Sequence, residues 1–162
     1  MMLTHDRLKE VLNYDPKTGI FTTLIKRCGP NNVGSVNGNS YLQIMIDRKI
    51  YSAHRLAWLY MKGEWPKDQI DHINGKRDDN RLVNLREATK SINSQNIKNH
   101  RKDNACGFLG VTVVTGNNLK KPWQASIRIS NKQIYLGCYK TPEAAHEAYL
   151  CAKRKLHRGC TI

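Results

Sequence analysis

Residues 70–93 read IDHINGKRDDNRLVNLREATKSIN, and they set the interpretation of the whole chain. A short strand is predicted to end at Asp71 and His72, before a loop rich in Asn, Asp and Gly, residues that favour turns. Asn84 follows His72 by 12 residues, and Asn93 follows Asn84 by nine. The polar residues therefore recur at intervals that a strand, a loop and a helix can bring together.

A short helix is predicted from about Lys90. Thr89 can cap it, because the Thr hydroxyl can accept a free N–H of the first helical turn. The helix would carry Asn93 and turn it back towards the strand. We therefore expect a carboxylate from Asp71, an imidazole from His72 and an amide oxygen to converge on one point.

These side chains suit hydrolysis of a phosphodiester. The attacking water must lose a proton near neutral pH, where His titrates. A hard cation must hold the scissile phosphate and neutralise charge on the leaving oxygen. Oxygen ligands, one carboxylate and one amide, suit Mg²⁺ or Mn²⁺ better than zinc. The competing interpretation, a turn pair followed by loop-forming Asn residues, is disfavoured by the spacing and the basic setting.

The order of these residues and the flanking words DHINGKRDDNRLVNLR resemble the HNH homing endonucleases of phages and bacteria. The resemblance implies a ββα-metal site in which Asp71 and Asn93 bind one divalent metal, Mg²⁺ or Mn²⁺. It implies that His72 is the general base and that Asn84 braces the loop. The word HRLAWLY at residues 54–60 is typical of the segment that precedes this site in such enzymes.

The chain is strongly basic. It has 162 residues, with 27 Lys and Arg against 13 Asp and Glu and a formal charge of +14, which predicts attraction to nucleic acid. Residues 1–89 carry 14 basic and 10 acidic groups (net +4), whereas residues 90–162 carry 13 and 3 (net +10). We predict a nuclease domain at 1–98, a basic linker at 99–109 and a DNA-binding domain at 110–162.

The cysteines and the hydropathy favour a reducing cytoplasm, and the resemblance implies that of a bacterial host. The five cysteines are odd in number and form no CxxC pair, which disfavours a zinc knuckle or a disulfide framework. The N-terminus lacks the apolar run of a signal peptide, and no stretch approaches the length that spans a membrane. A reducing cytoplasm and no membrane partner are expected, and the resemblance implies a phage-encoded protein.

Patterning predicts several elements upstream of residue 70. They are a helix at 4–13 capped by Thr4, a turn at 15–19, a strand at 20–25, a strand carrying Leu42, Ile44 and Ile46, and a helix at 54–61 that Gly63 ends. Arg55 is predicted to contact DNA. For His54, a phosphate contact and a structural role stay open.

The residue pattern of the C-terminal part predicts three strands, at 110–115, 123–130 and 133–139, and a helix from Thr141 onwards. One face of the sheet is expected to carry Ala125, Ile127, Ile134, Leu136 and Cys138 under the helix. The other face, with Arg128, Gln133, Tyr135 and Tyr139, is expected to be exposed. The predicted fold class is therefore α+β, with a small three-stranded antiparallel sheet packed on one helix after an HNH ββα-metal domain.

Residues 107–159 resemble the plant ethylene-response-factor (AP-two) type of DNA-binding domain, in the words W-x-A-x-I-R at 123–128, YLGCYKT at 135–141 and EAAHEAY at 143–149. The resemblance implies that the sheet enters the major groove. Arg positions of that family fall on Thr112 and Val114 here, so its target sequence is not implied. The predicted DNA contacts beyond Arg55 are Lys98, Arg101, Lys102, Thr112, Gln124, Ser126, Arg128, Gln133 and Tyr135.

Together these features predict a metal-dependent endonuclease of the homing type that binds duplex DNA. One metal site per chain and no visible dimerisation element favour a monomer that nicks one strand. Two alternatives remain. One is a non-catalytic, sequence-specific DNA-binding regulator with a vestigial nuclease site, and the other is a nuclease acting on RNA or structured DNA.

Overall fold

A computed structural model describes residues 2–25, 33–97, 100, 104, 106–116, 120–130 and 132–161. The chain forms two compact units, Met1–Lys90 and Ser91–Ile162, each with its own hydrophobic core. The predicted boundaries at residues 98 and 110 stay a prediction. Lys98, Arg101 and Lys102, three of the predicted DNA contacts, lie outside the described residues.

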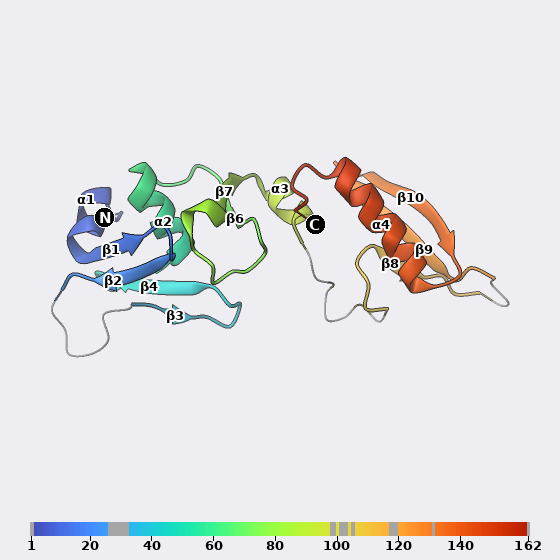
Figure 1. Ribbon diagram of the computed structural model, residues 1–162, viewed down its shortest axis with the longest axis horizontal. Helices are drawn as coiled ribbons and strands as arrows, with labels where there is room; N and C mark the ends of the chain where they lie inside the picture. The colour runs from blue at the N-terminus through green and yellow to red at the C-terminus, as the bar shows by residue number, and fades with distance from the viewer. Residues whose placement is uncertain are drawn as a thin grey trace. The chain divides into compact units, whose positions relative to one another are not determined.

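The described residues of the first unit form two α-helices and three small antiparallel sheets, β1–β2, β3–β4–β5 and β6–β7 (Figure 1). Its elements are, in chain order, α1 (His5–Val11), β1 (Leu12–Asp15), β2 (Ile20–Thr23), β3 (Ser35–Val36), β4 (Leu42–Ile46), β5 (Lys49–Ser52), α2 (Ala53–Lys62), β6 (Gln69–His72), the 3-10 helix η1 (Leu82–Asn84) and β7 (Leu85–Ala88).

The core of the first unit gathers around α2. Leu56 and Leu59 of α2 are buried with Leu8 of α1, Phe21 of β2 and Ile44 of β4. The pair β6–β7 contributes Ile70 and Leu85 to this core. No two-stranded sheet of this size is stable by itself in water, so β6–β7 depends on this shared core.

The predicted elements of the first unit are confirmed in kind and corrected at their ends. The Thr4 hydroxyl accepts the Arg7 amide and caps α1, and Gly63, at φ +80°, ends α2. The first helix stops at Val11 rather than at residue 13, because Leu12–Asp15 pairs with β2 as a strand that was not predicted. The strand at 20–25 is shorter, Ile20–Thr23.

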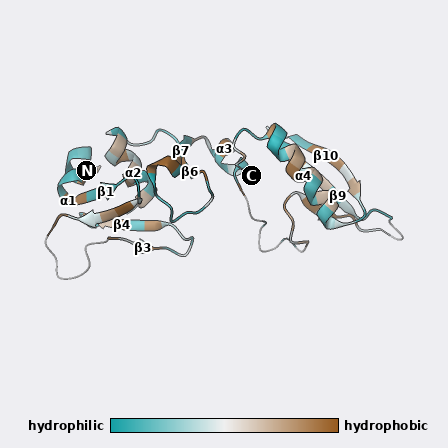
Figure 2. Cartoon of the chain, in the orientation of Figure 1, coloured by the Kyte–Doolittle hydropathy of each residue, from teal (hydrophilic) through white to brown (hydrophobic). Residues whose placement is uncertain are grey.

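The second unit holds a three-stranded antiparallel sheet in the order β10–β9–β8, packed on α4. Its elements are most of α3 (Lys90–Gln95), β8 (Val111–Val113), β9 (Trp123–Ile129), β10 (Lys132–Tyr139) and α4 (Pro142–Leu156). Hydrophilic and hydrophobic residues alternate along α4 (Figure 2). The three-stranded sheet packed on α4 confirms the predicted α+β class and the predicted sheet on one helix.

A β-bulge in β10 corrects the predicted faces of that strand. The pairing with β9 shifts between Tyr135 and Gly137, so Cys138 lies opposite Gln124 and Tyr139 opposite Trp123. Because paired residues share a face of the sheet, Tyr139 joins the core beside α4. Cys138 joins the polar face, where it accepts a hydrogen bond from the Tyr135 hydroxyl at 3.2 Å. The extra residue of a bulge reverses the alternation.

None of the described helices has both the length and the apolar run needed to cross a bilayer.

Candidate active site

The ladder between β6 and β7 positions Asp71 and His72. Its register places Asp71 opposite Arg86 and His72 opposite Leu85. The side chains of Asp71 and His72 are 5% and 4% exposed. Arg86 Nε and Nη2 both donate to Asp71 Oδ2, at 2.9 and 2.7 Å. Arg86 thus compensates the charge of a buried carboxylate, which would otherwise be costly.

Asn84 connects the two sides of the loop between the strands. Its Oδ1 accepts the Asn74 amide at 2.9 Å, and its Nδ2 donates to the Asp79 carbonyl at 2.8 Å. Its own carbonyl accepts the Ile73 amide at 2.9 Å. The Asn84 side chain is 5% exposed, so each of these bonds is shielded from water.

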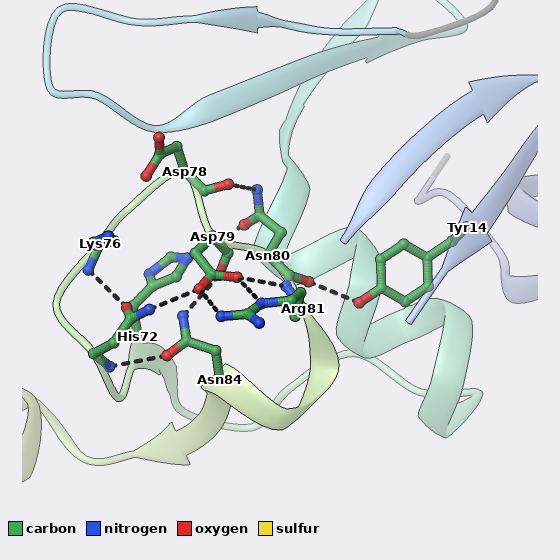
Figure 3. A network of polar contacts seen from close by, with 9 residues as sticks. Tyr14, His72, Lys76, Asp78, Asp79, Asn80, Arg81 and Asn84 are labelled. Atoms are coloured by element: carbon green, nitrogen blue, oxygen red, sulfur yellow. Dashed lines mark hydrogen bonds and ion pairs between the residues drawn. The ribbon is translucent and has the colours of Figure 1, made fainter. Parts of the chain in front are cut away.

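The Asp79 carboxylate is a second residue whose hydrogen bonds hold the loop together (Figure 3). It accepts Arg81 Nε at 2.7 Å and Arg81 Nη2 at 2.6 Å, and Asn74 Nδ2 at 2.7 Å. The hydrogen bonds from Arg81 contribute most to holding the pKa of Asp79 down, at about 2. Asp79 is therefore charged at neutral pH and fixes the loop just before Asn80.

Asn80 determines which nitrogen of His72 carries the proton. Asn80 Nδ2 donates to the Asp78 carbonyl at 3.2 Å, so Oδ1 is the atom that faces His72 Nε2, at 3.2 Å. A carboxamide oxygen can only accept. Nε2 is therefore the protonated nitrogen, and Nδ1 carries the lone pair that a general base needs.

Tyr14 of β1 holds Asn80 in place from outside the loop. Its hydroxyl donates to the Asn80 carbonyl at 2.7 Å. Burial, reinforced by the charges of Asp15 and Asp79, raises the pKa of Tyr14 to about 12. The hydroxyl thus remains a donor at neutral pH. The Asn80 side chain is 1% exposed, and this anchor reaches it across 66 positions of sequence.

Burial lowers the pKa of His72, although the Asn80 hydrogen bond and the charges of Asp71 and Asp79 oppose the shift. A His pKa below its ordinary value leaves the ring neutral at physiological pH. Neutral imidazole is the form that can take a proton from water.

His54 packs against His72, with ring centroids 5.1 Å apart in an edge-on arrangement. Tyr41 lies beside both rings, at 5.3 Å from His54 and 6.0 Å from His72. Burial, and then the charges of His72 and Arg55, lower the pKa of His54 to about 4. Among the described residues His54 Nδ1 has no hydrogen-bond partner. These contacts show a packing role for His54.

Arg55 is engaged within the first unit. Its guanidinium lies 5.7 Å from the Trp65 ring, and Nη1 donates to the Asp68 carbonyl at 3.5 Å. Its predicted DNA contact stays a prediction.

Asn93 lies on α3, in the second unit, and its side chain is half-buried. Its predicted pairing with Asp71 around a metal stays a prediction. Asp71 fits a hard divalent cation, because it supplies a carboxylate oxygen in a water-poor setting. Within the described ranges, no three His, Cys, Asp or Glu side chains gather so that they could hold a metal ion. The predicted set, one carboxylate and one amide, is not a cluster of that kind.

The predicted DNA contacts of the second unit share one face of its sheet. The register pairs Thr112 with Gln124, Arg128 with Gln133, and Ser126 with Tyr135, all on the face opposite the core. Arg128 and Tyr135 are exposed, Tyr135 by 60%. Gln133 Nε2 donates to Ser126 Oγ at 3.0 Å. The sheet therefore presents hydrogen-bonding side chains to solvent on its uncovered face.

Residues 51–95 match the family model described as HNH endonuclease. The chain contains an HNH endonuclease domain. That domain spans α2, the β6–β7 pair, the loop with Asn80 and Asn84, and α3. No curated protein matches the chain.

A solved structure described as "DNA binding and cleavage by the HNH homing endonuclease I-HmuI" is similar to part of the chain, at 22% identity and a TM-score of 0.42. The similarity covers 52% of this chain and spans half the length of that one.

Sequence reasoning missed three residues of this site. Asn80 lies within the stretch 70–93 but was read only as a loop former. Arg86 meets Asp71 through strand register, and Tyr14 reaches Asn80 from a strand that was not predicted. The run of two Asp and one Asn at residues 78–80, shortly before Asn84, was the signal for the first of them.

The His54 ring should make the protein less stable in acid. Well above pH 6.5, His54 is neutral in both the folded and the unfolded chain. Between pH 6.5 and about pH 4, His54 becomes protonated in the unfolded chain but stays neutral in the folded chain. From pH 7 to pH 5 the free energy of unfolding should therefore fall by about 2 kcal/mol through this group. Urea unfolding of wild type and His54→Phe at both pH values measures it. Equal losses in the two proteins would contradict the assignment.

Replacing Asn80 by Ala should impair His72, the predicted general base, without removing its imidazole. Both His72 tautomers then become accessible, so cleavage should slow about 10- to 100-fold. DNA affinity measured without metal should be unchanged. Asn39→Ala is the matched control, because the exposed Asn39 engages the fold through its backbone carbonyl. A wild-type cleavage rate in Asn80→Ala would show that the hydrogen bond does not orient His72.

Proposed function

We propose that this chain is a metal-dependent HNH homing-type DNA endonuclease that hydrolyses a phosphodiester bond of duplex DNA at a specific site. The observation that carries the proposal is His72 at the centre of the matched HNH domain, buried, neutral and with its lone pair on Nδ1. A positioned neutral imidazole is the group that hydrolysis near neutral pH requires.

In the proposed reaction His72 Nδ1 takes a proton from water, and the hydroxide attacks phosphorus in line with the leaving 3′ oxygen. The imidazolium that forms is stabilised by Asn80 Oδ1, which accepts from Nε2, and by the charges of Asp71 and Asp79. The bonds of Asn84 across the loop support its proposed role as the brace. The ring can then return its proton to solvent between turnovers.

Asp71 and Asn93 are the proposed ligands of one divalent metal, Mg²⁺ or Mn²⁺. When bound, the cation supplies charge neutralisation at the scissile phosphate and the leaving oxygen. Arg86 holds Asp71 Oδ2 through two hydrogen bonds and so orients the carboxylate.

The second unit is proposed to bind the target, in the manner of an ethylene-response-factor type domain. The polar face of its sheet supports this, because Arg128, Gln133 and Gln124 project hydrogen-bonding groups on one surface. The excess of basic residues in 90–162 adds attraction to the phosphate backbone. We further propose a monomer that nicks one strand. Its proposed setting, a phage gene expressed in the bacterial cytoplasm, rests on the family resemblance.

Cleavage of supercoiled plasmid tests the chemistry. Wild-type protein with Mg²⁺ or Mn²⁺ should give relaxed circles from a plasmid that carries a candidate insertion locus, and EDTA should abolish them. His72→Ala should lose about 10²- to 10⁴-fold in rate, the usual contribution of a general base. Asp71→Ala should also lose cleavage while retaining DNA binding.

Asp6→Ala is the matched control for the carboxylate, because the Asp6 side chain is 95% exposed. Linear product would point to paired cutting of both strands. Tight binding of DNA without any cleavage by wild-type protein would replace the nuclease by a DNA-binding regulator. Cleavage of RNA in preference to duplex DNA would instead change the substrate.

Substitution of Arg128 tests whether the polar face of the sheet recognises the bases of the target. Loss of a guanidinium fork that holds a guanine should cost about 1–3 kcal/mol of discrimination between sites. Arg128→Ala should therefore relax site preference, measured by competition binding, without changing the metal requirement of cleavage. Arg128→Lys separates the two kinds of contact, since Lys can replace a phosphate contact but not a bidentate base contact. Unchanged site preference in both variants would remove Arg128 from base recognition.

A further inference from the structure

Helix α3 is too short to be stable through its own hydrogen bonds. It has six residues, Lys90–Gln95, and none of them is buried. Isolated helices shorter than about 12–15 residues are marginal in water. The order of α3, and hence the position of Asn93 on it, must come from contacts with other parts of the chain.

The last residues of the chain supply such contacts. We call residues 157–161 the C-terminal segment. The Gly159 amide donates to Gln95 Oε1 at 3.0 Å, and the Thr161 hydroxyl donates to Asn96 Oδ1 at 2.6 Å. Both acceptors lie at the C-terminal end of α3, and the Asn96 side chain is 5% exposed. Two hydrogen bonds therefore join segments more than 60 positions apart in sequence.

Gly159 lies against the α3 backbone at a distance that only glycine allows. A Cβ at Gly159 would be 2.3 Å from the Ile92 carbonyl oxygen and 3.1 Å from Gln95 Cβ. Gly159 is itself buried. The Ile92 oxygen is backbone and cannot rotate away, so any side chain at position 159 must push the segment and the helix apart.

The C-terminal segment is tied in turn to the sheet and to α4. His157 Nε2 bonds to the Arg128 carbonyl on β9, at 3.0 Å, and the His157 amide donates to the Lys153 carbonyl at 3.0 Å. Lys153, 1% exposed, donates through Nζ to the Ile97 carbonyl just after α3. A buried ammonium requires such a partner. These contacts form one connected path from β9 through α4 and the C-terminal segment to α3.

We propose that the C-terminal segment is a positioning element of the nuclease: it holds α3 in place and so sets the position of the Asn93 side chain. The inference rests on the proposed function for the role of Asn93. It assigns to Gly159, Gln95 and Thr161 a part in the reaction that lies outside both the HNH motif and the DNA-reading face.

Amide hydrogen exchange on the full-length, metal-free protein tests the contact directly. Gly159→Ala should accelerate exchange of residues 91–97 about tenfold or more, since local opening follows loss of the contacts that oppose it. Exchange in β9 and β10 should change little. Gly38→Ala is the matched control, because a Cβ at Gly38 meets nothing within 4 Å. Thr161→Val removes one hydrogen bond without adding bulk and serves if Gly159→Ala does not fold.

Cleavage then tests the consequence for Asn93. In Gly159→Ala the metal concentration for half-maximal cleavage should rise about tenfold, as expected when support of a ligand is lost, with DNA affinity unchanged. Added to Asn93→Ala, the same substitution should have no further effect, because groups that act as a unit are not additive.

Unchanged exchange of residues 91–97 would overturn the inference, and so would additive effects of Gly159→Ala and Asn93→Ala. The failure of the nuclease proposal is distinguishable from both outcomes, since it would appear as a wild-type protein that cleaves no DNA at any metal concentration.

Discussion

The antiparallel register of β6 on β7 is the constraint on which the rest of the site depends. It sets Asp71 opposite Arg86 and His72 opposite Leu85, and so provides a compensated carboxylate and a buried imidazole at successive positions of one strand. A shift of one residue would move every side chain of the strand to the other face. The shared core fixes this register, because Ile70 and Leu85 are buried only in the observed pairing.

The loop between these strands acts as a scaffold rather than as a flexible connection. Asp79 and Asn84 bind its backbone from both sides, and the charge of Asp79 is secured by Arg81. Asn80 can then present one oxygen to His72. A His ring that is held in one tautomer does not have to change tautomer before it accepts a proton. His72 thus lies on a strand, and the loop supplies the hydrogen bond that orients its ring.

The two units contribute in different ways. The first contains His72, the proposed base, the loop that contacts it and a core built around α2. The second contains a sheet with one polar face and, through the C-terminal segment, the contacts that stabilise α3. Asn93 thus lies on a helix that the HNH motif alone does not stabilise.

The sequence alone determined most of the elements and the composition of the motif. Periodicity located α2, β9, β10 and α4, because each buries one face, and Thr141 marked the start of α4. The spacing of Asp71, His72 and Asn84 identified the HNH motif, since local order along the chain carries it. Only the tertiary structure decided the His72 tautomer, the Arg86 partner, the bulge that places Tyr139 in the core, and the Gly159 contact with α3. Each of these joins residues distant in sequence or depends on strand register, and local pattern contains neither.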